Sequence, residues 1–481
     1  MDKNNYKISS PSSSILLLIP SWGNDRHFYS TPHLGLGYAA SALMKHHHQV
    51  KVLDLSFYKK DLNILYRMIK DHQPEVVGIT GFTFQYTVAL EIIKFIKKNF
   101  PALITVLGGP HANAVADILL EQEQDIDFIL RGETEESFPQ FIQALFQGKD
   151  FDKVPGLVFR KEGAIVSSPP RYISNLDNLE YPWKAVNPLD YQKGRVHGFI
   201  CKRLPVTQVI SSRGCPYLCT FCAGQTVHGK KIRMRDPVKF VDELEFLKKQ
   251  FGIREVQIVD DNFTFYRDHA MAVCREMIRR RLNLTWSLPN GVRADRLDEE
   301  LLLLMKKAGC YYFAFGIEFG SPRILKLVKK SLDLDQARSS IRLANKLHFI
   351  TQGFFLMGHP EETEKDIELT GQFITSVPLD KIIINLPFPY PGSELFDFYI
   401  KNRYKDIKNI DWNYFKELDF KRIFQYLNNT VVLKKRRKIL LLFYLNPFNM
   451  LRFLFKFRTW VQWKSAFYGL LVLLEFFRKE R

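Results

Sequence analysis

The 481-residue sequence is poor in cysteine, which limits the kinds of fold and site that it can form. It has six cysteines, and only three of them lie close together, so a secreted fold held by a disulfide framework is excluded. No signal peptide is recognisable, because residues 1–14 are polar and serine-rich and the first apolar run, 15–19, is too short for one. These features predict a reducing, cytoplasmic setting.

Acidic residues and long apolar runs are both scarce at the end of the chain. Residues 421–481 contain 14 Lys and Arg but 2 Asp and Glu, so +12 of the formal net charge of +18 lies there, and a general nucleic-acid surface is not indicated. No stretch reaches the roughly 18 to 20 apolar residues of a membrane-spanning helix. Basic residues interleaved with Phe, Trp and Leu suit an interfacial helix on anionic lipid. Helices packed on the rest of the protein, or a surface for single-stranded nucleic acid, remain the alternatives.

The first part of the sequence alternates short apolar runs with helix-like stretches. The predicted strands are 15–19, 50–55, 76–80, 104–107 and 126–130, and the predicted helices are 36–45, 62–71, 86–99, 112–122 and 135–146. This alternation predicts an α/β domain over residues 14–148, a doubly wound and mostly parallel five-stranded sheet of Rossmann-like type, after a disordered N-terminus at 1–13.

Glycine-bearing turns follow several of these strands, where ligands bind in such folds. They include 32–37, 78–81, the turn that begins with Gly108 and Gly109, and the turn that contains Gly132 and Glu133. Glycine lets a large flat ligand approach the backbone closely. None of these turns forms G-x-G-x-x-G, so a dinucleotide site is only weakly indicated.

A second alternation follows a hairpin and a proline-bearing linker at 149–200. Its predicted strands are 206–210, 255–260, 284–288, 311–316, 351–357 and 381–386, and its predicted helices are 237–251, 267–280, 298–308, 335–347 and 364–376. Six βα units of this length predict a partial (β/α)6 barrel of TIM type over residues 201–420, with its site at the carboxyl ends of the strands. Residues 421–481 are predicted to form a basic, amphipathic helical tail.

Cys215, Cys219 and Cys222 follow the first barrel strand at C-x3-C-x2-C spacing. A structural zinc site requires four N or S ligands, and a ferredoxin cubane requires four thiolates. A cubane held by three thiolates keeps one iron open for a substrate or cofactor. The remaining cysteines, Cys201, Cys274 and Cys310, share no ligand spacing and are predicted to be spectators.

Polar residues also follow the other barrel strands. They are Asp260, Asp261, Asn262, Asn290, Arg293, Glu318, His359 and Tyr390. Each one alone is equally well explained as a helix cap or a loop ion pair. Together they predict a ring of polar groups around the cysteines.

These motifs resemble the radical S-adenosylmethionine (SAM) superfamily, and specifically its cobalamin-binding class. The resemblance rests on the cysteine motif with Phe221 before its last cysteine, and on 259–263, 315–318 and 355–363. Upstream, 107–112 and 130–133 resemble the cobalamin domain of that class. The resemblance covers about residues 14 to 400.

The resemblance implies that Cys215, Cys219 and Cys222 hold a [4Fe-4S] cluster whose free iron chelates SAM. Cleavage of SAM then yields a 5'-deoxyadenosyl radical that takes hydrogen from an unactivated carbon, and in this class cobalamin most often carries a methyl group to the substrate. By position, the backbone of Phe221 would contact adenine, Asp260 and Asp261 would lie by the amino group, and Glu318 would bind the ribose. Gly108, Gly109, Gly132 and Glu133 would contact cobalamin.

One loop departs from the class. Many cobalamin domains supply an axial histidine through D-x-H-x-x-G, but here Asp25 and His27 have no glycine at the required offset. This favours cobalamin bound without a histidine ligand and leaves open a degenerate domain that binds none.

The leading hypothesis is a cobalamin-dependent radical SAM enzyme that methylates a small molecule or lipid. The alternative is a cyclase, a ring-contraction enzyme or another oxidative enzyme of the same architecture. A methylthiotransferase is disfavoured because there is no second cysteine trio, and a cobalamin sensor or carrier would not need the first one. The implied partners are an electron donor such as flavodoxin or ferredoxin and, through the tail, a membrane surface. Nucleic acid is disfavoured.

Overall fold

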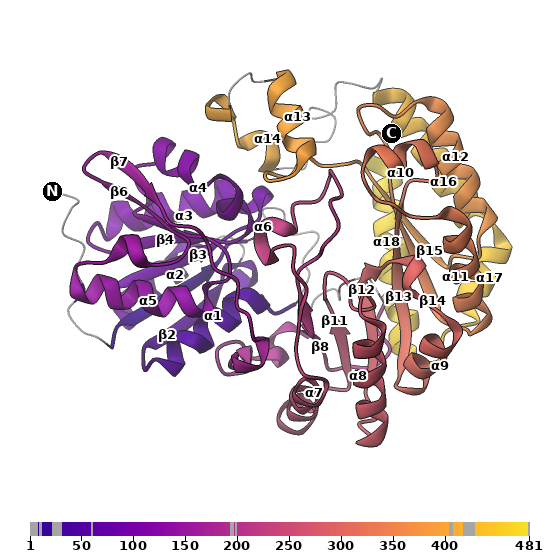
Figure 1. The fold of residues 1–481 in the computed structure, drawn as a ribbon, viewed down its shortest axis with the longest axis horizontal. Coiled ribbons are helices and arrows are strands. Elements are labelled where there is room, and N and C mark those ends of the chain that lie inside the picture. Colours follow the sequence, from indigo (N-terminus) through magenta and orange to yellow (C-terminus); the bar gives the residue numbers. More distant parts are fainter. Residues whose placement is uncertain are drawn as a thin grey trace.

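The structure is a computed structural model of the chain that describes residues 8, 12–21, 31–58, 61–192, 197, 200–403, 407–416 and 429–479. Most of the N-terminus that was predicted to be disordered, and the loop with Asp25 and His27, lie outside the described residues. Figure 1 shows two α/β units side by side, joined at the top by helices α13 (Glu394–Arg403) and α14 (Asn413–Lys416).

The first unit is a seven-stranded sheet in the order β2-β1-β3-β4-β5-β6-β7. Its strands are β1 (Ser14–Ile19), β2 (Gln49–Asp54), β3 (Val76–Thr80), β4 (Ile104–Gly108), β5 (Phe128–Leu130), β6 (Leu157–Lys161) and β7 (Ala164–Ser167). The five predicted parallel strands are confirmed. The predicted sheet was incomplete, because the hairpin β6–β7 pairs antiparallel with β5 and extends the sheet instead of belonging to a linker.

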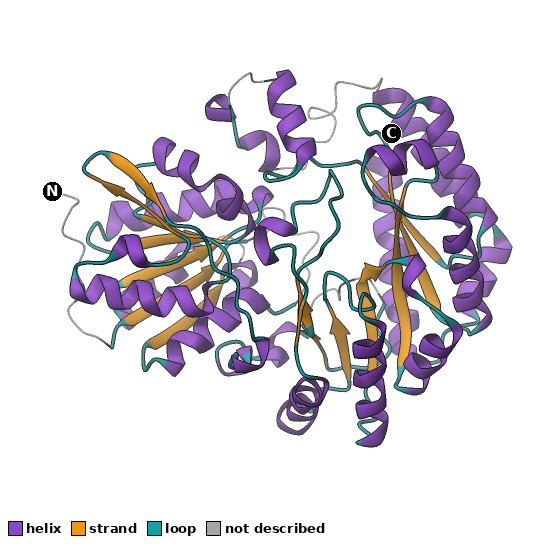
Figure 2. Cartoon of the chain, in the orientation of Figure 1, coloured by secondary structure: helices purple, strands orange, loops and turns teal. Residues whose placement is uncertain are grey.

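Helices cover both faces of this sheet (Figure 2). They are α1 (Leu34–Lys45), α2 (Leu62–His72), α3 (Tyr86–Asn99), α4 (Pro110–Gln122) and α5 (Thr134–Gln147). α1 and α5 pack on one face, and α2, α3 and α4 pack on the other, so each face has its own apolar core. The residues of β1 from Ile15 to Ile19 are buried, as expected for a central strand of a sheet that is covered on both sides.

The second unit is an open barrel of six parallel strands in the order β15-β14-β13-β12-β11-β8. The strands are β8 (Val206–Val209), β11 (Glu255–Ile258), β12 (Thr285–Val292), β13 (Cys310–Glu318), β14 (Ile350–Leu356) and β15 (Lys381–Asn385). Its helices are α7 (Pro237–Phe251), α8 (Arg267–Arg279), α9 (Glu299–Lys307), α10 (Pro322–Leu327), α11 (Leu334–Lys346) and α12 (Glu364–Ser376). The predicted partial barrel is confirmed, with α10 as an additional helix after the fourth strand.

The described part of the tail packs on the barrel and forms three helices. They are α16 (Asn429–Tyr444), α17 (Pro447–Leu454) and α18 (Trp460–Lys479). Phe457 packs with Tyr311 and Ile350, at the first residues of β13 and β14. Lys456 Nζ lies 2.7 Å from Oδ2 of the buried Asp380, just before β15. Among the described helices, none combines the length and the apolarity that a membrane crossing requires.

Candidate active site

A cavity of about 400 Å³ lies between the two units, where the carboxyl ends of both sheets meet. One wall comes from the ends of β3, β4 and β5, and includes Gly78, Gly108 and Gly132. The other wall comes from the barrel and includes Val259, Asp261 and Asn290. The short helix α6 (Gln225–His228), which follows the cysteines, stands between the units (Figure 1) and contributes Val227 and His228.

The cysteine loop begins at a tight turn that only glycine allows. β9 (Ser212–Arg213) pairs antiparallel with β10 (Arg233–Met234), and Gly214 leaves this ladder with a φ of +100°. A Cβ at Gly214 would lie 2.3 Å from the carbonyl oxygen of Lys231. This close approach of the two segments fixes where the loop with Cys215 starts.

The three loop cysteines form a cluster of thiols. Burial raises the pKa of all three, that of Cys222 to about 11, and the charge of Cys219 adds to the rise at both Cys215 and Cys222. The charges of the thiolates thus act on one another, and the raised pKa values favour the protonated thiols unless a cation compensates them. Among the described residues, no three His, Cys, Asp or Glu side chains converge on a single-ion site. Three soft thiolates that each bind a different iron fit an iron–sulfur cluster.

The other three cysteines are separate from this cluster. Cys201, Cys274 and Cys310 are buried, and burial raises the pKa of each thiol. Buried thiols with a raised pKa are inert, in agreement with the prediction that they are spectators.

Glu318 and Lys330 lie beside Cys219. Lys330 Nζ is 3.1 Å from Glu318 Oε1, and Cys219 acts electrostatically on Lys330. Burial would lower the pKa of Lys330, but the charges of Glu318 and Cys219 raise it. Glu318 has a φ of +70° at a register shift between β13 and β14. Such irregularities at the ends of strands re-aim side chains, often beside active sites.

Arg293 holds the backbone of this region in place. It donates to the carbonyl oxygens of Lys330 and Ser331, each at 2.8 Å, and pairs with Asp295. Sequence reasoning found Glu318 and Arg293 at strand ends but missed Lys330. Its neighbours Lys329 and Ser331 both have positive φ, and neither is a glycine that would have marked the turn.

Asp261 lines the cavity and holds the cysteine loop. Its Oδ2 accepts from Gly214 N–H at 3.2 Å and lies 3.1 Å from His228 Nδ1. Burial would raise the pKa of Asp261, but the hydrogen bond and charge of His228 and the N–H of Gly214 lower it. Asp261 therefore remains a carboxylate at the cavity wall.

Asp260 points away from the cavity. Its carboxylate accepts from Ser211 N, Ser211 Oγ and Ser212 Oγ at 2.7, 2.5 and 2.7 Å, and it is buried. This network ties the end of β11 to the chain that leads into the cysteine loop. We assign Asp260 a positioning role in place of the predicted cofactor contact.

The glycines of the first unit serve two different purposes. A Cβ at Gly109, which has a φ of +90°, would lie 2.6 Å from Thr80 Oγ1, so this glycine is required by the fold. A Cβ at Gly132 would lie 2.8 Å from Pro170. Gly108 differs, because a Cβ there meets only the carbonyl oxygen of Leu130, at 3.4 Å, and Gly108 lines the cavity. Gly108 is thus the glycine that leaves room for a ligand.

Glu133 lines the cavity but is engaged in a buried ion-pair cluster. Arg233 donates two hydrogen bonds to its carboxylate, at 2.5 and 2.7 Å, and Arg213 Nη2 lies 2.7 Å from Glu135 Oε1. Burial would raise the pKa of Glu133, but Arg233 and Arg213 lower it. Both arginines flank the cysteine loop, and both glutamates belong to the first unit. These ion pairs therefore connect the two walls of the cavity.

The remaining candidates lie in other surroundings. The side chain of Phe221 packs against the small apolar cluster of Phe319 and Val328, and Thr220 N–H donates to the carbonyl oxygen of Val328 at 3.1 Å.

His359 packs on Phe319, and burial lowers its pKa to about 4. His359 and Tyr390 do not line the cavity. His33 does, although it was noted only as part of a turn, and its Nδ1 accepts from Leu36 N–H at the start of α1.

Comparison with known proteins assigns the two units. Residues 209–374 match the radical SAM superfamily, and residues 27–142 match the B12 binding domain. The chain is 29% identical to an uncharacterised methyltransferase of Pyrococcus horikoshii, over 92% of this chain and 93% of that one. It is 30% identical to an anaerobic magnesium-protoporphyrin IX monomethyl ester cyclase of Rubrivivax gelatinosus, over 67% of this chain and 58% of the cyclase.

A solved structure shows the same fold. The radical SAM methyltransferase TsrM of Kitasatospora setae, with cobalamin and a [4Fe-4S] cluster bound, superposes with a TM-score of 0.67 at 21% identity. The match covers 81% of this chain and 75% of TsrM. In the present chain the carboxyl ends of the two corresponding units meet at the cavity of Gly108 and Asp261.

Proposed function

Because this chain is a member of the cobalamin-binding class of the radical SAM superfamily, we propose that it methylates an unactivated carbon of a small molecule or lipid. Its cofactors are a [4Fe-4S] cluster, SAM and cobalamin. When bound, they supply the electron that cleaves SAM to a 5'-deoxyadenosyl radical and the methyl group that cobalamin carries. The radical would abstract hydrogen from the substrate carbon, which would then receive the methyl group.

The observation that carries this proposal is the shared cavity. Gly108 from the first unit and Gly224 from the cysteine loop line the same space. A ligand on the glycine-rich wall would therefore lie next to the cluster loop, as transfer of a group from cobalamin to a radical formed there requires. The Glu133–Arg233 ion pair would fix the position of one wall relative to the other.

The chain's own residues would bind and orient the reactants. Cys215, Cys219 and Cys222 would hold the cluster, and the backbone of Phe221 would contact adenine. Asp261 would attract the ammonium group of SAM, since its carboxylate stays charged at the cavity wall. Glu318 would accept from the ribose hydroxyls while Lys330 holds its other side.

Non-methylating radical chemistry is the second candidate. It is favoured by the similarity to the anaerobic magnesium-protoporphyrin IX monomethyl ester cyclase, which is named for ring formation. A cobalamin sensor or carrier is disfavoured, because it would have no use for the three cysteines of the loop.

Two partners follow from this function and from the tail. The cluster needs one electron for each cleavage, and we propose flavodoxin or ferredoxin as the donor. We also propose that the basic, aromatic tail makes peripheral contact with the inner face of the membrane.

Anaerobic assays distinguish methylation from the alternative. With reductant, methylcobalamin, SAM and the true substrate, a methylase forms 5'-deoxyadenosine, S-adenosylhomocysteine and a methylated product. Formation of 5'-deoxyadenosine and an altered product without S-adenosylhomocysteine would instead establish the cyclase-type reaction.

We expect Glu318→Gln to weaken SAM binding by about 10- to 100-fold, because charge-assisted hydrogen bonds contribute about 1.5–3 kcal/mol. Lys330 would also lose its ionic partner. The dissociation constant of SAM, measured by equilibrium dialysis on reconstituted protein, checks this expectation.

Glu394→Gln is the matched control. It removes the carboxylate that pairs with the neighbouring Lys329 at 2.6 Å, in a pair whose side chains are half exposed. Exposed pairs contribute little, so SAM binding should be unchanged. Equal SAM affinity of Glu318→Gln and the wild type would rule out the ribose role of Glu318.

A further inference from the structure

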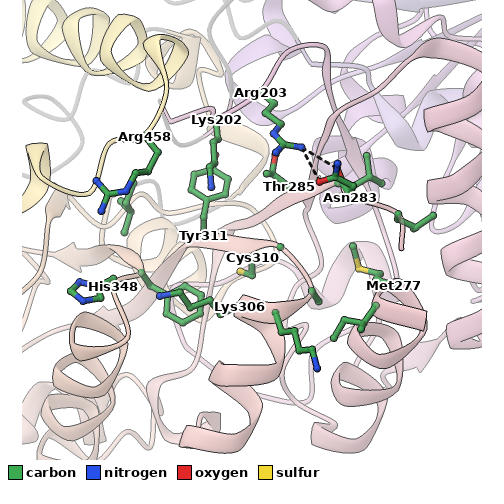
Figure 3. A pocket seen from close by; sticks show the side chains of 18 of the residues that line it. Lys202, Arg203, Met277, Asn283, Thr285, Lys306, Cys310, Tyr311, His348 and Arg458 are labelled. Atoms are coloured by element: carbon green, nitrogen blue, oxygen red, sulfur yellow. Dashed lines mark hydrogen bonds between the residues drawn. The ribbon is translucent and has the colours of Figure 1, made fainter. Parts of the chain in front are cut away.

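A second pocket lies at the opposite end of the barrel from the cysteines. It has a volume of about 660 Å³ and is lined by the first residues of β12, β13 and β14 and by the turn between α17 and α18 (Figure 3). Lys202, Arg203 and Arg458 lie along one side of the pocket in this view, and Lys306 and His348 along the other. Tyr311 forms part of the wall between them.

The pocket is strongly basic. Seven Lys and Arg residues and one His line it, and no Asp or Glu does. Within the described chain, Lys202, Arg203, Lys306 and Arg458 form no salt bridge. Arg203 and Arg458 donate instead to the carbonyl oxygens of Asn283 and Phe455, at 3.1 and 2.7 Å. The pocket therefore contains positive charge that the protein does not neutralise.

These cations also repel one another. Burial lowers the pKa of Lys202, and the charges of Arg203, Arg458 and Lys306 lower it further. The charge of the buried Glu255 raises this pKa but does not cancel the decrease. Burial and the charge of Arg458 lower the pKa of Lys306. An anion in the pocket would relieve this repulsion.

Arg458 stands between two strongly exposed aromatic residues of the tail. Phe455 is 72% exposed and Trp460 79% exposed. Arg452 of α17 and Lys456 just after it both contact the buried Asp380, while Phe448 of α17 is 79% exposed.

Apolar side chains are exposed elsewhere along the tail too, in a stretch without negative charge. Leu445, Phe467 and Leu471 are also exposed. Residues 429–471 contain no Asp or Glu. An exposed apolar patch with basic residues around it is typical of a surface that lies in the bilayer interface.

We propose that the basic pocket binds the phosphate group of an anionic phospholipid while the exposed aromatic side chains of the tail enter the headgroup region. This site gives a structural basis to the membrane contact proposed above and does not depend on the radical chemistry. Because the pocket and the cysteines occupy opposite ends of the barrel, the bound lipid is an anchor and not the substrate. The mouth of the active site would then face away from the bilayer.

Flotation of reconstituted full-length protein with vesicles tests this site. We expect flotation with vesicles of phosphatidylcholine and phosphatidylglycerol, and little with phosphatidylcholine alone. The double variant Lys306→Glu/Arg458→Glu should bind the anionic vesicles at least about tenfold more weakly. Phe455→Ser/Trp460→Ser should also reduce flotation. Because none of these residues lines the cavity of Gly108, all variants should still form 5'-deoxyadenosine.

Two matched controls isolate the pocket and the aromatic face. Lys98→Glu/Lys184→Glu reverses two exposed charges outside the barrel, and Leu189→Ser/Leu303→Ser replaces exposed apolar residues outside the tail, so both should float like the wild type. Undiminished flotation of the pocket variant overturns the proposal. The proposal is also overturned if glycerol phosphate raises the thermal stability of the protein but the protein does not float with any vesicles, because the pocket would then bind a soluble anion.

Discussion

Replacement of Cys219 by alanine should abolish cleavage of SAM. If Cys215, Cys219 and Cys222 hold the cluster as proposed, two thiolates should not retain it. The described residues offer no substitute thiol, because the other cysteines are buried in separate places. We expect formation of 5'-deoxyadenosine to fall on the order of 10³-fold or more. The measurement is 5'-deoxyadenosine by chromatography, together with the iron content and visible spectrum of anaerobically reconstituted protein.

Cys274→Ala is the control for this variant. Cys274 is buried in α8, and burial raises its pKa to about 12, so its thiol is protonated and inert. The control should keep its iron and its activity. Unchanged SAM cleavage by Cys219→Ala, or equal loss of iron from both variants, would refute the assignment of the cluster. Unchanged cobalamin content in Cys219→Ala would show that the first unit is intact.

The helices and strands could be predicted closely because their signals are local. Helices α3, α7 and α12 have the predicted bounds, since apolar periodicity and caps such as Asp236 before Pro237 mark them directly. Strands β12 and β13 run further than predicted. Register shifts carry their backbones past the apolar runs to the polar residues that face the site.

The pairings that build the site have no local signal. Glu133 and Arg233 are 100 residues apart, and nothing in either segment indicates the other. The sequence singled out Glu133 because of its motif, but its two arginine partners depend on how the units meet. Lys330 was missed for the same reason, because it matters only through its contact with Glu318, across a turn without glycine.

The direction in which the side chains of the tail face could not be predicted from its composition. This composition fitted both a membrane surface and a packed helix. The structure confirms packing on the barrel and leaves aromatic side chains exposed, and the membrane contact stays a prediction. Arg452 and Lys456 face the barrel through Asp380, while Phe448 and Phe455 are exposed. Composition cannot reveal this arrangement, because in an ordinary amphipathic helix the charges would be outside.

Replacement of Gly108 by leucine should weaken cobalamin binding and leave the cluster in place. Gly108 lies at the end of β4 without positive φ, and a Cβ there has only an ordinary contact, so the variant should fold. The longer side chain would enter the cavity that Gly108 lines. Overpacking costs about 1–3 kcal/mol, so we expect cobalamin affinity to fall by roughly 5- to 150-fold. Cobalamin content by absorbance, and iron content, are the measurements.

The neighbouring glycine shows why position 108 separates ligand binding from folding. Leucine at Gly109 would collide with Thr80 at a φ of +90°, so loss of cobalamin there would report only a distorted loop. Gly469→Leu is the matched control, since a Cβ at Gly469 meets no atom within 4 Å. If Gly108→Leu binds cobalamin as tightly as this control, cobalamin does not occupy the cavity. If Gly108→Leu loses cobalamin and methyl transfer but still forms 5'-deoxyadenosine, SAM cleavage does not depend on cobalamin. This result is expected when one wall of the cavity binds cobalamin and the other carries the cysteine loop.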